Sequence, residues 1–346
     1  MESIEITRPD DWHLHLRDGK SLARVLPYTA RRFRRAIVMP NLDPPVTTVA
    51  EAAHYRERIL AVLPSDLEFE PLMALYLTDA TTGSEIEAAA ASPIVAAVKF
   101  YPMGATTNSA RGVASLAELN PALEALERSG LPLLVHGEAI SPDCDVFDRE
   151  RVFLEDTLRP LVERFQGLRV VFEHITTEDA VSFVEAMPER IAATITPQHL
   201  LLNRNALFAG GLRPHHYCLP VLKRERDRQA LVRAATEGDP SFFLGTDSAP
   251  HERGDKESAC GCAGIFSAPV ALEAYAEVFF RADAMDRLEG FASFHGPDFY
   301  RLPRNVDRIR LERKNWIGPT RDGEGAESLE FFWAGESFHY RVEELG

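Results

Sequence analysis

The stretch Leu131-Pro-Leu-Leu-Val-His136 is a short apolar run that ends at a histidine. Its apolar residues follow one another with little alternation, which is typical of a strand buried on both faces. Parallel sheets covered by helices contain strands of this kind. The stretch Arg169-Val-Val-Phe-Glu-His174 repeats the pattern and again ends at a histidine. The two stretches together predict neighbouring strands of a parallel sheet.

Eight such stretches occur along the chain. They cover residues 12–16, 36–39, 72–77, 94–100, 131–136, 169–174, 191–195 and 242–245. Between and after them lie segments whose apolar residues recur at spacings of three and four, as on one face of a helix. These segments include residues 49–63, 116–128, 156–165, 178–187, 227–237 and 270–280. A strand followed by a helix, repeated eight times, predicts an α/β fold of the (β/α)8 TIM-barrel type.

The length of 346 residues alone suggests two domains, but barrels of this type often exceed the usual domain size. Because the strand and helix pattern continues without a linker or low-complexity segment, we predict one domain over residues 1–346. The barrel is expected at about residues 5–282. The remaining residues, about 283–346, mix short aromatic and charged segments and are expected to form an appendage packed on the barrel.

Composition excludes several classes of protein and partner. The chain is 45% hydrophobic, which argues against disorder, and its 38 Lys and Arg against 53 Asp and Glu leave a net charge of -15. Nucleic acid and anionic membranes would be repelled on average, so neither is expected as a partner. No apolar stretch approaches 18 residues, the N-terminus lacks a leader pattern, and four cysteines suit a reducing compartment. We therefore expect a cytoplasmic protein.

Polar residues capable of binding a metal lie at or just after the ends of the predicted strands. They are His13, His15, His136, His174 and Asp247, and Lys99 and Asn41 have equivalent positions. Lys99 and His136 are 37 residues apart, His136 and His174 are 38 apart, and His174 and Asp247 are 73 apart. These spacings correspond to one, one and two strand-helix units. All of these side chains should meet at the carboxyl ends of the strands, where barrels of this type carry their chemistry.

The residue types indicate which metal such a site would hold. His13 and His15 are two apart, so a strand would place both on one face, with Leu14 on the other. Imidazole and carboxylate ligands without thiolate suit zinc or another borderline divalent ion and argue against magnesium or calcium. Cys260 and Cys262 lack the CxxC spacing of a zinc knuckle, and free thiols are the better interpretation.

Lys99 is unusual among these residues because an ammonium has no lone pair and would be repelled by a metal. One interpretation is that it pairs with a carboxylate or a substrate anion. The alternative, which its position among four histidines and an aspartate favours, is that its neutral amine has reacted with carbon dioxide. The resulting N6-carboxylysine would be an anionic ligand that can bridge two metals.

The chain resembles the dihydroorotases of the single-domain bacterial type (class II), in the amidohydrolase superfamily. The resemblance is carried by His13-Leu-His-Leu-Arg-Asp18, Met39-Pro-Asn41, Val98-Lys-Phe-Tyr-Pro102, Val135-His-Gly-Glu138, Phe172-Glu-His174 and Gly245-Thr-Asp-Ser-Ala-Pro-His251. It continues through Ala105-Thr-Thr-Asn-Ser109, Thr196-Pro-Gln-His199, Cys218-Leu-Pro-Val-Leu-Lys-Arg224 and Glu257-Ser-Ala-Cys-Gly-Cys-Ala-Gly264. It implies zinc-dependent, reversible cyclisation of N-carbamoyl-L-aspartate to (S)-dihydroorotate in pyrimidine (UMP) biosynthesis, by a homodimer.

The resemblance also implies a role for individual residues. One zinc would be held by His13, His15, carboxylated Lys99 and Asp247, and a second by Lys99, His136 and His174. The substrate would contact Arg17, Asn41 and His251, the backbone of Leu219 and Ala263, and also His15 and His136. Asp247 would act as the catalytic base, and Thr106 and Thr107 would belong to a mobile loop that closes over the substrate.

Other residues near the predicted mouth have less specific interpretations. His199 is placed at the end of the seventh strand and is expected to give structural support, and His215 and His216 are expected in a solvated loop. Cys218 and Cys262 are expected to be small buried fillers. Two other functions are disfavoured by the sequence. Arg17 and Asn41 argue against a related hydrolase of hydantoins or lactones, and the complete set of ligands argues against an inactive scaffold.

Overall fold

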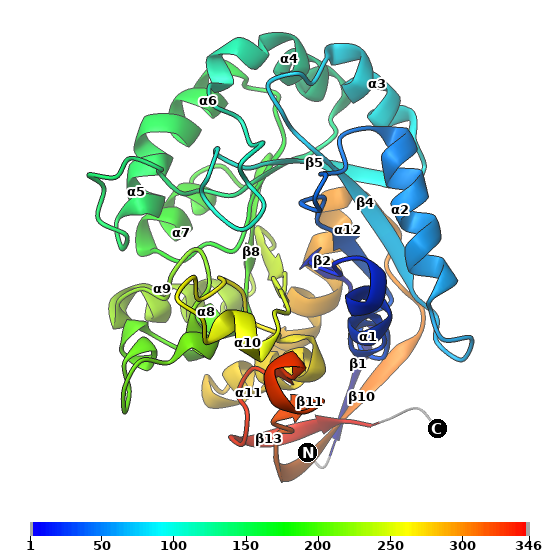
Figure 1. The fold of residues 1–346 in the computed structure, drawn as a ribbon, viewed down its shortest axis with the longest axis vertical. Coiled ribbons are helices and arrows are strands. Elements are labelled where there is room, and N and C mark those ends of the chain that lie inside the picture. The colour runs from blue at the N-terminus through cyan, green and yellow to red at the C-terminus, as the bar shows by residue number, and fades with distance from the viewer. Residues whose placement is uncertain (1–2, 344–346) are drawn as a thin grey trace.

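The computed structural model describes residues 3–343, and its centre is an eight-stranded parallel sheet (Figure 1). Neighbouring strands in the sheet are also consecutive in the chain, as expected for strand-helix units. In order they are β2 (Asp11–Leu14), β3 (Arg35–Val38), β4 (Glu70–Tyr76), β5 (Val95–Phe100), β6 (Leu133–Val135), β7 (Val170–Phe172), β8 (Ile191–Ile195) and β9 (Phe242–Leu244). These are the eight strands that the sequence predicts.

Each strand of the sheet is followed by at least one helix, and the helices form the outer layer (Figure 1). In order they are α1 (Gly19–Ala30), α2 (Val49–Ala61), α3 (Gly83–Ala91), α4 (Asn120–Ser129), α5 (Arg149–Phe153) with α6 (Arg159–Arg164), α7 (Glu178–Glu185), α8 (Pro197–Leu201) with α9 (Glu225–Thr236), and α11 (Ala271–Arg281). The predicted TIM-barrel class is confirmed, with a sheet that is nearly closed.

Several helical regions differ from the predicted segments, which include neither α3 nor α8. The helix predicted from residue 156 begins at Arg149 instead, and α5 continues into α6 through wider π-type turns at Leu154–Leu158. The repeated pattern predicts a helix after the first strand but not its bounds, because α1 begins at Gly19 and contains Pro27, two residues that weaken a helical pattern. The Asp18 side chain accepts a hydrogen bond from the backbone N–H of Gly19 and caps this helix.

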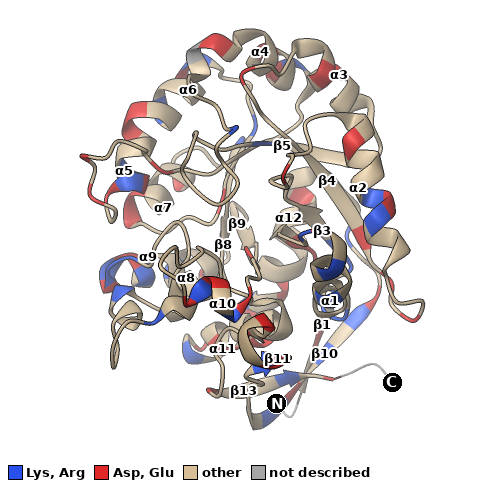
Figure 2. Cartoon of the chain, viewed as in Figure 1, with Lys and Arg blue, Asp and Glu red and all other residues tan. Residues whose placement is uncertain are grey.

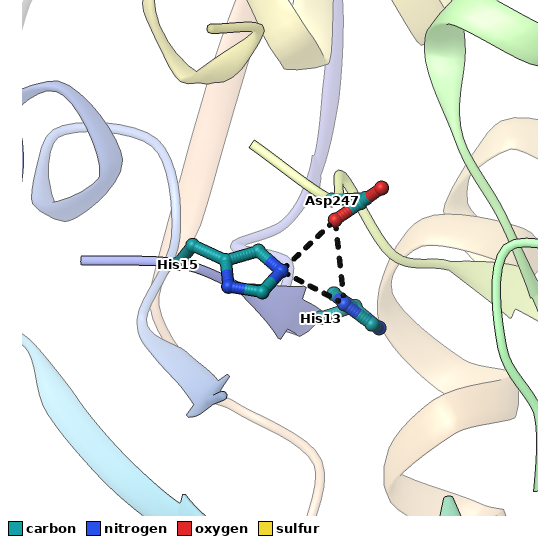
Figure 3. A group of neighbouring side chains, drawn as sticks. All are labelled: His13, His15 and Asp247. Atoms are coloured by element: carbon teal, nitrogen blue, oxygen red, sulfur yellow. Dashed lines mark hydrogen bonds and ion pairs between the residues drawn. The ribbon is translucent and has the colours of Figure 1, made fainter. Parts of the chain in front are cut away.

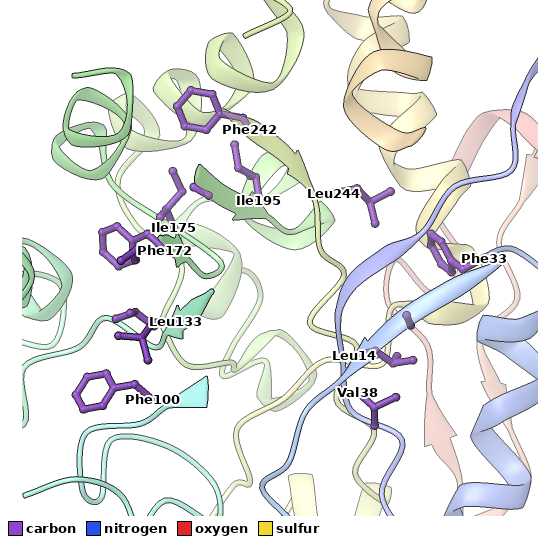
Figure 4. Close-up of a cluster of buried hydrophobic side chains, with 14 of the residues drawn as sticks. Leu14, Phe33, Val38, Phe100, Leu133, Phe172, Ile175, Ile195, Phe242 and Leu244 are labelled. Carbon is purple, nitrogen blue, oxygen red and sulfur yellow. The ribbon is translucent and has the colours of Figure 1, made fainter. Parts of the chain in front are cut away.

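The strands separate two hydrophobic clusters because successive side chains of a strand point to opposite faces. In β6, Leu133 and Val135 pack outward against the helices, whereas Leu134 points into the barrel. In β9, Phe242 packs outward and Phe243 points inward. Figure 4 shows part of the outer cluster, which lies between the strands and the helices. A residue two positions after an inward apolar residue therefore also faces the interior of the barrel.

The amino-terminal end of the barrel is closed by aromatic residues. Trp12 of β2 stacks on Tyr300 of α12 (His295–Tyr300), with ring centroids 4.5 Å apart and ring planes 8° apart. Phe243 packs against Tyr300 edge-on. Because these rings fill the interior at the amino-terminal ends of the strands, the interior at the carboxyl-terminal ends is left for polar side chains.

The two ends of the chain form a small sheet beside the barrel. β1 (Ser3–Thr7) pairs with β10 (Arg308–Ile317), which pairs with β13 (Ser337–Val342), all antiparallel. A two-stranded ribbon of β11 (Arg321–Asp322) and β12 (Leu329–Glu330) precedes β13. The division at about residue 282 stays a prediction. Tyr300, which follows that position in the sequence, belongs to the hydrophobic cluster inside the barrel.

The charged residues lie mainly on the outer helices and on β10, where both signs are intermixed (Figure 2). The strands of the barrel carry few of them, as expected for a sheet that is covered on both faces. Across residues 3–343, the structure contains no helix that is long and apolar enough to cross a membrane.

The aromatic closure predicts a large difference between two substitutions at one position. Tyr300→Ala should lower the free energy of unfolding by about 3 kcal/mol, because it removes a buried ring and leaves a cavity. Tyr300→Phe should change it by less than about 1 kcal/mol, because the Tyr300 hydroxyl has no hydrogen-bond partner among the described residues. Urea denaturation measures both values, and equal losses would contradict the stacking argument.

Candidate active site

The barrel closes between its first and last strands, and the candidate site lies at this junction. The Asp247 N–H donates to the His13 carbonyl (2.9 Å), and the His15 N–H donates to the Ser248 carbonyl (3.1 Å). The buried Asp11 carboxylate accepts hydrogen bonds from the Thr246 N–H (2.9 Å) and hydroxyl (2.6 Å). These contacts place residues 13–15 against residues 246–248.

His13, His15 and Asp247 converge from the two sides of this junction (Figure 3). The His15 Nε2 atom lies 3.1 Å from Asp247 Oδ1, and the His13 Nε2 atom lies 3.4 Å from the same oxygen. The two Nε2 atoms are 3.3 Å apart. Three potential ligand atoms thus surround one point, as a metal site requires.

A second pair of histidines lies beside this cluster. His136 Nδ1 is 3.2 Å from His174 Nε2, and the His174 ring centroid is 5.0 Å from that of His13. His136 follows the inward-facing Leu134 by two residues, so the pleat of the strand directs it into the barrel. Both imidazoles are buried.

The outer ring nitrogens of three histidines each meet a side-chain oxygen. Glu173 Oε2 lies 2.5 Å from His13 Nδ1, Asn41 Oδ1 lies 2.9 Å from His15 Nδ1, and Glu138 Oε2 lies 2.9 Å from His136 Nε2. An oxygen acceptor at one ring nitrogen favours a proton there and leaves the lone pair on the other nitrogen. The three rings are therefore oriented with a lone pair toward the cluster.

Lys99 is completely buried and its Nζ atom has no hydrogen-bond partner among the described residues. It follows the inward-facing Ala97 by two residues and so also points into the barrel. Burial lowers the pKa of Lys99 to about 8, although Glu173 and Asp247 oppose the shift. A buried amine that titrates near neutral pH can become the neutral nucleophile.

The charge states of the other groups suit ligands. Burial lowers the pKa of His13 and of His174 well below the usual range, so both rings are neutral near pH 7. Burial alone would raise the pKa of Asp247, but its neighbours His13, His15 and Lys99 outweigh burial and lower it to about 2. Neutral imidazoles and an ionised carboxylate are the forms that bind metals.

Three residues of the site adopt left-handed backbone conformations, which are uncommon for residues other than glycine. The φ angles are 60° at Arg17, 42° at His174 and 45° at Asp247. Each such residue costs of the order of 1 kcal/mol, and strain of this kind tends to cluster at functional sites. Here it follows the strand ends, where the backbone turns and keeps the side chain at the mouth.

A cationic group lies next to the histidine cluster. Arg17 Nη2 is 2.9 Å from His251 Nε2, and Arg17 Nε donates to the Pro250 carbonyl (3.1 Å). His251 Nε2 also lies 3.0 Å from the Ala263 carbonyl. Burial, followed by the charge of Arg17, lowers the pKa of His251 to about 3, so this imidazole is neutral. A neutral nitrogen either donates or accepts, so only one of its two contacts is a hydrogen bond at a time.

The segment that contains Thr106 and Thr107 lies over the mouth. Asn41 Nδ2 donates to the Thr107 carbonyl (3.1 Å), and the Thr107 hydroxyl donates to the Ala263 carbonyl (3.4 Å). The cavity below has a free volume of about 20 Å³, which is room for about one water molecule. Its lining includes Leu219 as well as the histidine cluster.

The structure therefore brings the predicted site residues to one mouth. His199 lies in α8 rather than at a strand end, and both of its ring nitrogens are engaged, by the Thr196 hydroxyl (2.7 Å) and the Pro220 carbonyl (3.0 Å). Cys218 is buried as expected, but Cys262 is only half-buried, so the prediction of a buried filler is wrong for Cys262. Cys262 lies in a stretch without helix or strand, and its carbonyl accepts a hydrogen bond from Lys256 Nζ (2.8 Å).

Sequence reasoning missed the two carboxylates that orient the histidines. Glu173 lies two residues after the inward-facing Val171, so the alternation of β7 indicates that it faces the interior but not that it contacts His13, and Glu138 lies beyond the end of β6. It also missed Tyr101, which lines the cavity. Neither the spacing of the ligands nor their residue types points to such partners.

The residues fit a metal centre. The donor set is imidazole and carboxylate, the ring nitrogens that carry lone pairs converge, and the buried Lys99 amine lacks a partner. A sequence profile described as the amidohydrolase family matches residues 10–315. A dihydroorotase of Methylobacillus flagellatus is 62% identical over 342 residues, which cover 99% of each chain. The chain belongs to the amidohydrolase family, among the dihydroorotases.

Solved structures agree with this placement. A dihydroorotase of Saccharomyces cerevisiae, in complex with 5-fluoroorotic acid, superposes with a TM-score of 0.91 at 33% identity over 99% of both chains. A dihydroorotase of Campylobacter jejuni superposes with a TM-score of 0.90 at 34% identity, over 99% of this chain and 97% of that one. This amidohydrolase is accordingly a hydrolase that acts on cyclic amides, and its cluster of His13, His15 and Asp247 supports dependence on a metal.

The carboxylate on His13 predicts an effect on metal binding. Glu173→Leu keeps the volume of the side chain but removes the acceptor at His13 Nδ1, so metal affinity should fall about 10-fold to 100-fold. Metal content at graded free zinc, measured by elemental analysis of the dialysed protein, gives the affinity.

Glu150 offers a matched control for this variant. It is equally buried, but its carboxylate binds Thr176 and Thr177 rather than a histidine. Glu150→Leu should reduce stability and leave metal affinity within about twofold of the parent value. Equal metal loss in both variants would show that Glu173 acts through general stability.

Proposed function

We propose that this protein catalyses the reversible cyclisation of N-carbamoyl-L-aspartate to (S)-dihydroorotate, the ring-closing reaction in the synthesis of pyrimidines (UMP). One observation carries the proposal: the cluster of potential metal ligands and the cationic side chain of Arg17 line the same cavity. Asp247 is the only carboxylate among the described residues that line the cavity, although the chain carries a net charge of -15. An anionic substrate is therefore favoured there by local charge.

Two zinc ions per chain complete the proposal. His13, His15, carboxylated Lys99 and Asp247 would hold one ion, and Lys99, His136 and His174 would hold the other. When bound, the zinc ions would supply an activated water near neutral pH and polarise the ring carbonyl. The orphaned Lys99 amine supports the modification, because attack on carbon dioxide forms an N–C bond, releases one proton and leaves an anionic carboxylate.

The residues beside the cluster would bind and orient the substrate. Arg17 would hold the substrate carboxylate through its planar pair of donors, with Asn41 and His251 beside it. The backbone of Leu219 and Ala263 would meet the ring amide groups, and both residues line the cavity. His15 and His136 would complete the contacts. Binding would then fix the ring carbonyl next to the metal cluster.

Asp247 would move the proton in this reaction. Its carboxylate is ionised at neutral pH, so an oxygen atom can take the proton of the attacking water and deliver it to the departing ring nitrogen. Ring closure uses the same groups in reverse and releases water. The loop with Thr106 and Thr107 would open to admit substrate, because a cavity of about 20 Å³ is too small for it.

We also propose that the protein works as a homodimer in the cytoplasm. The mass of one chain is 38.6 kDa, so light scattering separates a dimer from a monomer directly. A monomer at all concentrations would contradict this part of the proposal, and the chemistry above does not depend on it.

The activity is tested with dihydroorotate and with hydantoin, which has the cyclic amide but no carboxylate. The zinc-loaded protein should hydrolyse dihydroorotate, which is measured as loss of the ultraviolet absorbance of the ring amide. It should hydrolyse hydantoin only slowly. Arg17→Gln should lower kcat/KM for dihydroorotate about 100-fold, because it removes a charged, two-donor contact. Its residual rate with hydantoin should stay within about threefold of the parent rate. Absence of dihydroorotate hydrolysis by the zinc-loaded parent would contradict the proposed function.

The carboxylated lysine is tested separately. Lys99→Ala should lose bound metal and at least about 100-fold of the activity, because the bridging ligand is gone. A short carboxylic acid such as acetate or propionate should restore part of both by occupying the vacated space. Full activity of the variant without an added acid would refute the bridge.

A further inference from the structure

Lys256 is a buried lysine that the proposed mechanism does not use. It ends the short helix α10 (Arg253–Lys256), and its side chain is 3% exposed. Its Nζ atom donates hydrogen bonds to three backbone carbonyls: those of Tyr217 (2.8 Å), Cys262 (2.8 Å) and Gly264 (2.7 Å). An ammonium has three N–H donors, so every donor of Lys256 is used within the protein.

These carbonyls belong to two segments that are distant in the sequence. Tyr217 precedes Leu219 by two residues, and Cys262 and Gly264 flank Ala263 on both sides. The direct hydrogen bond between the segments is that from the Gly264 N–H to the Tyr217 carbonyl (3.0 Å). Lys256 therefore bridges the two segments, with one hydrogen bond to the first and two to the second.

The segment around Gly264 tolerates little displacement. Its φ angle is 147°, and a Cβ atom there would lie 2.6 Å from the Ala249 carbonyl oxygen and 2.8 Å from His251 Cδ2. The backbone thus packs directly against the imidazole that borders Arg17. A shift of this segment would move both the His251 side chain and the Ala263 backbone.

Helix α10 is itself fixed from the outside of the barrel. The Arg253 N–H donates to the Ser328 carbonyl (2.8 Å), and Arg24 of α1 donates to the Asp322 carboxylate (2.6 Å) and to the Glu327 carbonyl (2.7 Å). Residues near the carboxyl end of the chain therefore hold the helix that presents Lys256.

Because burial lowers the pKa of Lys256 only to about 8, the ammonium form still predominates near pH 7.

We propose that Lys256 is a positioning residue for substrate binding, which holds the backbone of Leu219 and Ala263 at the separation that the ring amide groups require. The proposal rests on the proposed function, in which these two residues contact the substrate. Lys256 does not line the cavity, so it acts through the two segments. Its loss should weaken binding of the ring and leave the metal cluster and the chemical step in place.

The test compares the zinc-loaded parent with Lys256→Met, which has a similar length but no donors. The dissociation constant of 5-fluoroorotic acid, measured by calorimetry, and the KM for dihydroorotate should each rise about tenfold. The kcat value should change by less than about threefold, because the variant removes binding that is equal in the ground and transition states. Metal content should equal that of the parent.

Lys223→Met is the matched control. Lys223 is also 3% exposed, but its Nζ atom donates to the carbonyl of Val221 within its own segment (3.0 Å) and makes no hydrogen bond to a second segment among the described residues. Its dissociation constant for 5-fluoroorotic acid should stay within about twofold of the parent value. Equal weakening in both variants would overturn the proposal, and so would a folded Lys256→Met protein with parent affinity or with a fall in kcat alone.

Two further outcomes are separated by the design. If Lys256→Met does not fold, Gly264→Ala is used instead, because the added Cβ atom displaces the same segment while Lys256 is kept. The same rise in KM and in the dissociation constant is expected. Parent affinity in Gly264→Ala would overturn the proposal. If the parent itself does not hydrolyse dihydroorotate, the proposed function fails rather than the role of Lys256.

Discussion

The junction between β2 and β9 both closes the barrel and assembles its chemistry. No long ladder of hydrogen bonds joins these strands; the contact is the backbone bonding of His13 and His15 to residues 247 and 248, with the Asp11 carboxylate beside it. Two potential ligands therefore lie on one side of the junction and Asp247 on the other. Any change that opened the barrel here would also separate the ligands, so stability and site geometry depend on the same few contacts.

Burial around this junction has an electrostatic consequence. The interior offers little water to screen charge, so each buried group takes the form that its neighbours support. The His13 and His174 imidazoles become neutral, Asp247 remains ionised because of its neighbours, and the pKa of Glu173 rises to about 7 mainly through burial. These side chains therefore already have the protonation states in which they can bind a metal cation. The carboxylates behind the histidines then select which ring nitrogen faces inward.

The position of the cavity also accounts for the layers of the protein. Aromatic rings from β2, β9 and α12 fill the amino-terminal half of the barrel, and polar residues occupy the carboxyl-terminal half. In β5, β6 and β7 the pleat directs alternate residues inward, so the apolar residues Ala97, Leu134 and Val171 are followed two residues later by Lys99, His136 and Glu173. Outside the barrel, the segment near residues 322–328 supports α10, which in turn supports the wall of the cavity.

The amino-acid sequence by itself determined the strand and helix alternation, the barrel class and the set of residues at the mouth, including Lys99 and Asp247. These features are encoded locally, in the period of apolar residues and in spacings of whole strand-helix units. Only the tertiary structure decided which ring nitrogen of each histidine faces the cluster, that Glu173 and Glu138 orient them, that Tyr300 closes the barrel and that Lys256 links two distant segments. Each of these depends on residues that fold together from distant positions, and no local pattern in the chain records such a contact.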